Sequence, residues 1–211
     1  MSSLSVYLLG DFQVHLDGQN ITRKFRTNKE RALFAYLVIE SERPHMREFL
    51  SDLFWPRQNE SSSRANLRQA LLGIRRALEE PKDDPIFVSP SEETIQINPQ
   101  ASIWVDAIAF SSRLQTTQDH HHLSLSQCDA CIQRLSEAVD LYRQEFLAGL
   151  YLEESQAFHD WQIVNREHFL RFLLIALDSL AEFFQNAGNL ELAQKYAWKY
   201  VHLDPLEEGA H

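Results

Sequence analysis

The sequence predicts a mainly α-helical fold with small β elements, in which an α+β half (residues 1–100) precedes an all-helical half (residues 101–211). Apolar residues alternate near the N-terminus, as they do in half-buried strands. Their spacing becomes helical from Thr27 and, after a short return to alternation, is helical almost throughout from Ile103. The junction between the two predicted domains therefore falls near residues 99–102.

The first strands are predicted at the start of the chain. Residues 5–18, SVYLLGDFQVHLDG, place apolar side chains at alternate positions. The Asp17-Gly18 pair is a strong signal for a two-residue hairpin turn. Residues 19–25 are therefore expected to form the return strand.

Three helices and a hairpin complete the predicted first half. The expected positions are residues 27–40, 47–55 and 61–80 for the helices and residues 86–99 for the hairpin. Asn59 or a nearby serine is expected to cap the third helix. Two helices joined by a tight turn and followed by a hairpin have the order of a winged helix-turn-helix.

The composition is that of a globular protein. At 211 residues and 44% hydrophobic, the chain can bury a core and can hold one domain or two. No apolar run approaches the length of a membrane span, and the N-terminus shows no export signal. Two cysteines cannot build a disulfide framework, so we expect a cytoplasmic location.

Charge is unevenly distributed along the chain. The formal net charge is −10, yet residues 1–100 contain 13 Lys plus Arg against 14 Asp plus Glu, whereas residues 101–211 contain 7 against 16. Residues 23–31, RKFRTNKER, hold five cations and one acid. Because salt screens each charge beyond about 8–10 Å, such local patches decide attraction to a polyanion. The acidic second half is not expected to bind DNA.

The third predicted helix contains the most informative stretch. Residues 61–78, SSSRANLRQALLGIRRAL, hold four arginines and no carboxylate. On a helical wheel Leu67, Leu71, Ile74 and Leu78 share one face, which we expect to be buried. The remaining positions carry arginine and amide side chains, which suit phosphate and base-edge contacts in a major groove. A solvated face that happens to lack acids is the alternative, although surface helices usually mix both signs of charge.

Six segments occur in an informative order: LLGDFQVHLDG, LSDLFWP, RANLRQALLGIRRAL, IWVDAIAFSSRL, AVDLYRQEFLAGL and LAEFFQNAGNLELAQKYAWKYVHLDPLEEGAH. Together they resemble the Streptomyces antibiotic regulatory protein (SARP) family over essentially the whole chain. The resemblance implies a transcriptional regulator, most simply an activator. Its winged helix-turn-helix (residues 1–100), similar to response-regulator output domains, would bind DNA. A helical bacterial transcriptional activator domain (residues 101–211) would follow.

The resemblance also implies which residues bind DNA. They belong to the third helix, to the turn before it and to the start of the first helix, where backbone N–H groups favour a phosphate: Arg64, Asn66, Arg68, Gln69, Arg75, Arg76; Arg57; Arg26, Thr27 and Lys29. Trp55 is expected in the core. Glu92 and Glu93 make the hairpin tip acidic, so we do not expect it to enter a minor groove.

The second half carries a repeat-like pattern. Gly188, Leu190, Ala193 and Pro205 keep tetratricopeptide spacing. Similar regulators continue into further helices, so we expect residues 101–211 to be a helical domain truncated at its C-terminus. Its expected roles are dimerisation on repeated half-sites, contacts with RNA polymerase, or docking against the winged helix, and a rigid spacer is the alternative.

Other chemistry is less well supported by the sequence. Cys128 and Cys131 form a C-x-x-C downstream of His120, His121 and His122, but the spacing matches no zinc template, so we expect no metal and no cofactor. No phosphate-binding glycine loop or catalytic motif occurs, so we expect no enzyme. Two alternatives stay open: a scaffold whose winged helix binds protein, and the N-terminal part of a large regulatory ATPase.

Overall fold

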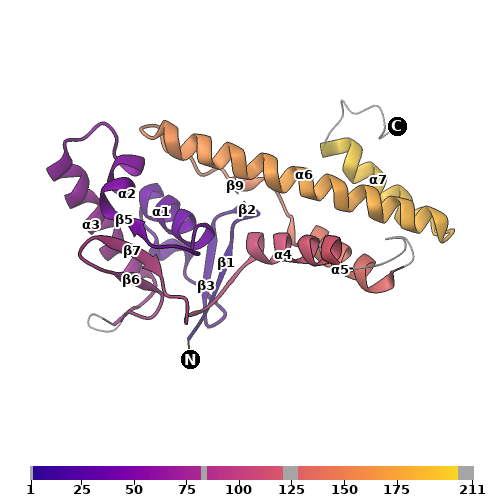
Figure 1. Ribbon diagram of the computed structural model, residues 1–211, viewed down its shortest axis with the longest axis horizontal. Coiled ribbons are helices and arrows are strands. Elements are labelled where there is room, and N and C mark those ends of the chain that lie inside the picture. The colour runs from indigo at the N-terminus through magenta and orange to yellow at the C-terminus, as the bar shows by residue number, and fades with distance from the viewer. Residues whose placement is uncertain (1, 82–84, 121–127, 204–211) are drawn as a thin grey trace. The chain divides into compact units, whose positions relative to one another are not determined.

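The computed structural model describes residues 2–81, 85–120 and 128–203 (Figure 1). The chain divides into two compact units. The first contains residues up to Asp106 together with Phe146–Val164, and the second contains Ala107–Glu145 together with the chain from Asn165. The predicted boundary near residue 100 lies close to the end of the first stretch. Residues 146–164, however, pack with the first unit, although they lie within the sequence range of the second half.

The elements of the first unit are short strands and three helices. In chain order they are β1 (Ser3–Tyr7), β2 (Gly10–Asp11), β3 (Gln13–Leu16), β4 (Gln19–Asn20), η1 (Thr22–Lys24), α1 (Asn28–Ile39), β5 (His45–Met46), α2 (Arg47–Phe54), α3 (Glu60–Ala77), β6 (Val88–Pro90), β7 (Thr94–Ile97), β8 (Ser102–Val105), β9 (Phe146–Ala148) and the beginning of α6 (Gln156–Asn186). α3 packs against α1 and α2, and β6 and β7 follow it as a hairpin. This is the predicted winged helix-turn-helix.

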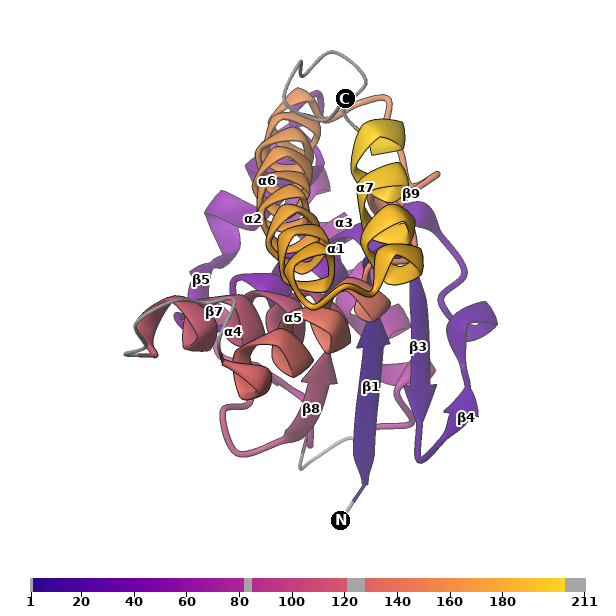
Figure 2. The same ribbon diagram turned by 90° about the vertical axis from the view of Figure 1, so that its right-hand side faces the viewer.

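The N-terminal sheet has the strand order β4-β3-β1-β8, which Figure 2 shows from the edge of β8 to that of β4. β1 and β3 are antiparallel, and Leu4 lies opposite Leu16. Asp17 and Gly18 form the predicted turn with φ values of 48° and 82°. The return strand was predicted too long, because β4 has two residues and a 3₁₀ turn follows it.

The prediction of continuous helix from residue 103 was wrong at β8. This strand pairs in parallel with β1, and α4 (Asp106–Asp119) begins directly after it. The buried Asp106 carboxylate accepts hydrogen bonds from the backbone N–H groups of Leu8 and Leu9, at 2.7 and 3.1 Å. A four-residue apolar strand has no periodicity that separates it from helix, so the pairing partner decides its conformation.

A second strand also lies in the half predicted to be helical. β9 pairs in parallel with β2 in a two-stranded sheet. The hydroxyl of Ser155 donates to the carbonyl oxygen of Leu53, and Trp161 Nε1 donates to the Glu40 carboxylate at 2.9 Å. The Trp161 ring lies 5.0 Å from that of Tyr36. Segment 146–164 thus contributes to the core beside α1 and α2.

The second unit is helical. It contains α4, α5 (Asp129–Leu141), the rest of α6 and α7 (Leu190–Leu203). α6 and α7 are joined by the predicted turn, where Gly188 has a φ of 75°, and the Phe184 and Tyr196 rings stack at 5.7 Å. Pro205 of the repeat pattern lies outside the described residues. Among the described helices, none combines the length and apolarity required to cross a membrane.

Candidate nucleic-acid interface

α3 has one buried face and one exposed face. The Asn59 side chain accepts a hydrogen bond from Ser62 N–H at 2.9 Å, which confirms it as the N-cap. The predicted apolar face is buried, with Leu67, Leu71 and Ile74 at most 5% exposed. The helix therefore presents its remaining positions to solvent.

The exposed face carries cations, an amide and one apolar side chain. Arg68, Gln69, Leu72 and Arg76 are all exposed. Within the described part of the chain, the guanidinium groups of Arg68 and Arg76 have no ion-pair or hydrogen-bond partner. These two groups can therefore bind a phosphate or a base edge without first breaking a contact inside the protein.

Two grooves flank α3. The first, about 760 Å³ in volume, lies on the side of the wing, which we define as β6, β7 and the connecting residues 91–93. Arg47 at the start of α2 joins Arg64 and Arg68 there. Burial, and secondarily the nearby charge of Arg68, lower the pKa of Arg47. Arg47, Arg64 and Arg68 thus bring three cations to this groove.

Hydrogen bonds from Arg47 hold the tip of the wing against the start of α2. Arg47 Nε donates to the Ser91 carbonyl oxygen at 2.9 Å, and Arg47 N–H donates to the Glu93 carbonyl oxygen at 2.8 Å. Glu92 and Glu93 of the tip, together with Glu48 of α2, line the same groove. Three carboxylates therefore line this groove beside the three cations Arg47, Arg64 and Arg68.

The second groove, about 670 Å³ in volume, lies between α3 and the start of α1. Five cations line it: Arg23, Lys24, Arg26, Lys29 and Arg76. The amide side chains of Asn66 and Gln69, both from α3, also line it. Arg23 and Arg26 are exposed, whereas Lys24 is paired with Glu79. Positive charge therefore flanks the exposed face of α3 on this side as well.

The carboxylate in this second groove belongs to the helix cap. Glu30 is 8% exposed, and its Oε2 accepts from Arg26 N–H at 2.7 Å, while Thr27 Oγ1 accepts from Glu30 N–H at 3.1 Å. This is a variant of the capping box, in which the glutamate bonds the residue before the cap. Gly73 allows the approach, since a Cβ there would lie only 2.6 Å from Glu30 Cδ. Thr27 thus acts as the N-cap of α1.

Lys29 is engaged in packing. Its ammonium donates to the Phe54 carbonyl oxygen, lies 3.7 Å from a Glu154 carboxylate oxygen and sits 5.4 Å from the centre of the Trp55 ring. Burial lowers the pKa of Lys29, and Glu154 opposes that shift. Trp55 is 6% exposed, as expected of a core residue.

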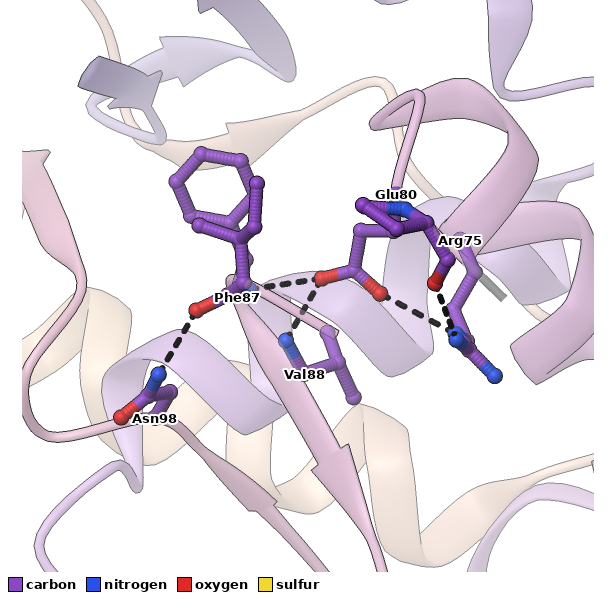
Figure 3. A network of polar contacts seen from close by, with 7 residues as sticks. Arg75, Glu80, Phe87, Val88 and Asn98 are labelled. Atoms are coloured by element: carbon purple, nitrogen blue, oxygen red, sulfur yellow. Dashed lines mark hydrogen bonds and ion pairs between the residues drawn. The ribbon is translucent and has the colours of Figure 1, made fainter. Parts of the chain in front are cut away.

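Arg75 lies in a polar network that joins the end of α3 to the wing (Figure 3). Its Nε donates to Glu80 Oε2 at 3.1 Å, and its Nη2 donates to the Pro81 carbonyl oxygen at 2.8 Å. The other Glu80 oxygen accepts from the N–H groups of Phe87 and Val88, at 2.7 and 2.8 Å. Arg75 is therefore bound to a fully buried carboxylate, that of Glu80.

The end of α3 explains how Glu80 reaches this position. Glu80 N–H donates to the Arg75 carbonyl oxygen and Glu79 N–H to that of Arg76, which is the hydrogen-bond pattern of a Schellman motif. Glu79 occupies the left-handed position with a φ of 56°. The chain reverses there and directs the Glu80 carboxylate towards the first strand of the wing.

The remaining predicted residues lie near the start of α3. Arg64 is paired with Glu60 at 2.6 Å, although its side chain keeps 54% exposure. Glu60 lies just before the acid-free stretch, so the sequence interpretation missed this pair. Asn66 Nδ2 donates to Gln58 Oε1 at 2.7 Å, and Arg57 is exposed in the turn before the helix.

Sequence reasoning missed Leu72 and Arg47 as residues of this surface, and it noted Arg23 only as part of the cationic patch of residues 23–31. Leu72 is 42% exposed among the cations of α3, and Arg23 and Arg47 line the two grooves. The helical wheel contained the signal for Leu72, because it places this leucine opposite the buried face. An apolar side chain at such a position can contact a thymine methyl group.

Comparison with known proteins supports the fold. No protein-family model matches the sequence, and no curated protein sequence matches it. Among solved structures, the chain is similar over its full length to Mycobacterium tuberculosis EmbR in complex with a low-affinity phosphopeptide. The TM-score is 0.75 at 20% sequence identity, and the chain spans 53% of the length of that EmbR chain. The predicted fold, a winged helix-turn-helix followed by a helical domain, is thereby confirmed.

Proposed function

We propose that this protein is a sequence-specific DNA-binding transcriptional regulator that inserts α3 into a major groove. One observation carries the proposal: the exposed face of α3 presents Arg68 and Arg76, which have no ion-pair or hydrogen-bond partner among the described residues, beside the exposed amide of Gln69. An α-helix fits the B-DNA major groove, where arginine and amide side chains read base edges. The full-length similarity to EmbR supports a regulator of the SARP type.

The contacts divide into two classes. Arg26, which precedes α1, and Arg57, which lies between α2 and α3, are exposed and are assigned to phosphates, together with Arg23. Arg68, Gln69 and the neighbouring Asn66 and Arg76 are assigned to base edges or to the phosphates bordering them. Arg64 would exchange Glu60 for a phosphate, which is a small cost because exposed ion pairs contribute little. Lys29, Thr27 and Arg75 would support this surface through the contacts they make inside the protein.

The helical second unit is assigned to protein contacts. Residues 101–211 carry 7 cations against 16 acids, so they repel DNA. RNA polymerase and a second copy of the chain on a repeated half-site are the proposed partners. One winged helix covers a short site, so two adjacent copies raise the affinity through effective concentration. Activation would follow from the polymerase contact.

Salt dependence tests DNA binding. If four of the exposed arginines neutralise four phosphates, log K falls with log salt at a slope of about −3.6. Affinity for a duplex should therefore decrease about 150-fold between about 50 and about 200 mM salt. Fluorescence anisotropy with random and promoter-derived duplexes measures both quantities. Absence of binding at the lower salt, or binding that salt leaves unchanged, would contradict the proposal and favour a winged helix that binds protein.

Leu72 provides a test of base reading. We expect Leu72→Ala to lower affinity for a selected site by about 1 kcal/mol, roughly fivefold, because the leucine loses its contact with a thymine methyl group. Replacing thymine by deoxyuridine at the contacted step should weaken binding of the wild type and leave the variant unaffected. Leu190→Ala, which removes an exposed leucine of α7, is the matched control. Equal sensitivity of wild type and variant to deoxyuridine at every step would refute the contact.

A further inference from the structure

The end of α4 and the start of α5 bring three metal-ligating side chains together. Nδ1 of His120 lies 3.0 Å from Cys131 Sγ and 3.5 Å from Cys128 Sγ. The ligand atoms of all three residues lie within 4.8 Å of one another. In the described part of the chain, this is the group of His, Cys and carboxylate side chains that could hold a metal ion.

Local helix geometry places the two thiols side by side. Cys128 is the N-cap residue of α5, and Cys131 lies in the first turn, where its N–H donates to the Cys128 carbonyl oxygen at 2.9 Å. A spacing of three residues in the first turn puts both side chains on the same side of the helix end. Cys131 is fully buried and Cys128 is half-buried, so the pair lies at the edge of the core.

We propose that His120, Cys128 and Cys131 bind one Zn²⁺ ion through the imidazole Nδ1 and two thiolates. Zinc prefers nitrogen and sulfur ligands in a tetrahedron, in which neighbouring ligand atoms lie about 3.6–3.8 Å apart. The three atoms here require shifts of about 1 Å or less to reach that arrangement. Binding displaces the two thiol protons, so affinity increases with pH until both thiols are ionised.

The surroundings of the cluster suit such an ion. The Arg134 guanidinium lies 3.7 Å from Cys131 Sγ, where it can donate to the bound thiolate and orient it. A site with three protein ligands leaves a fourth position for water or another ligand. The ion would fasten the end of α4 to the start of α5 within the second unit. This site is independent of DNA binding by α3.

This inference departs from the expectation of no metal. The sequence expectation rested on spacing, and the seven residues between His120 and Cys128 match no zinc template. The other candidate ligands considered, His121 and His122, lie outside the described residues. The structure shows that Nδ1 of His120 lies close to the sulfur atoms of both cysteines, and the sequence spacing could not predict this.

Cobalt substitution tests the site. The chain contains two cysteines in total, so a sulfur-to-cobalt charge-transfer band reports on Cys128 and Cys131 alone. The reduced 211-residue chain should bind one equivalent of Co²⁺ with this band and with the intense visible bands of tetrahedral coordination. Added Zn²⁺ should displace the cobalt stoichiometrically. Competition with a chromophoric chelator then measures the zinc affinity.

Variants locate the ligands. Cys128→Ser, Cys131→Ser and His120→Ala should each weaken zinc binding more than the roughly 10–100-fold typical of losing an outer-shell partner. His202→Ala, which removes an exposed histidine of α7, is the matched control and should bind as the wild type does. Far-ultraviolet circular dichroism confirms the fold of each variant. His120 is exposed, so its variant is expected to fold even if Cys131→Ser does not.

Three results would overturn the proposal. The first is a reduced wild-type chain that binds no stoichiometric Co²⁺ or Zn²⁺. The second is metal affinity that His120→Ala and Cys128→Ser leave unchanged. The third is a cobalt complex without the sulfur charge-transfer band, which would place the metal elsewhere. A Cys128–Cys131 disulfide that forms under air while the reduced chain ignores metal would assign the pair to thiol oxidation instead.

Discussion

Arg68→Ala/Arg76→Ala should lower the affinity of the protein for its DNA site about 100-fold at low salt, because each arginine is expected to contribute about 1.4 kcal/mol. Two fewer phosphate-neutralising charges would also reduce the magnitude of the salt slope by about 1.8. Both side chains are exposed and have no ion-pair or hydrogen-bond partner among the described residues, so stability should change little. Fluorescence anisotropy at several salt concentrations measures both effects.

The matched control removes the same charge from the helical unit. Arg143→Ala/Arg171→Ala also deletes two exposed arginines, and it should leave affinity within about twofold of wild type because the acidic helical unit is not expected to bind DNA. Equal losses in the two double variants would attribute the effect to net charge alone. An unchanged affinity of Arg68→Ala/Arg76→Ala would exclude α3 as the reading helix.

Glu80→Ala should lower the free energy of unfolding by about 3 kcal/mol. The Glu80 side chain is 0% exposed, and it joins Arg75 to the N–H groups of Phe87 and Val88. The substitution leaves two backbone donors and one guanidinium without their carboxylate partner. Urea denaturation monitored by tryptophan fluorescence measures the change, since Trp55 and Trp161 lie in the same unit.

The neighbouring glutamate is the control for this prediction. Glu79→Ala removes a carboxylate that is 60% exposed and, among the described residues, is paired with the exposed Lys24, so it should cost no more than about 0.5 kcal/mol. If the Glu80→Ala and Glu79→Ala variants unfold at the same urea concentration, the Arg75–Glu80 network does not hold the wing. DNA affinity of Glu80→Ala should also decrease, because the wing and the end of α3 lose their common anchor.

The sequence predicted the helix-turn-helix well because its signals are local. The 3.6-residue period of Leu67, Leu71 and Ile74 fixed the buried face of α3, and the Asn59 cap fixed its beginning. The Asp17-Gly18 turn was recognised from the positive φ values that it requires. Such features depend on neighbours within a few residues, so one sequence suffices to find them.

The short strands could not be predicted in the same way. β8 and β9 exist because β1 and β2, about a hundred residues away or more, offer hydrogen-bonding edges. The Asp106 carboxylate accepts hydrogen bonds from the backbone N–H groups of Leu8 and Leu9, and no pattern of residue spacing in the sequence predicts this interaction. Contacts between distant residues therefore decide the structure wherever a segment is too short to show a period.

The same division applies to the candidate DNA surface. The sequence by itself determined that α3 would carry cations and amides opposite an apolar face, since composition and helical period fix both. Only the tertiary structure decided which cations are available: Arg68 and Arg76 remain exposed, whereas Arg75 is bound to Glu80 and Lys29 to Phe54. The physical reason is that the free energy of a charged group depends on its partners and its burial. Those partners come from segments that the chain brings together only on folding.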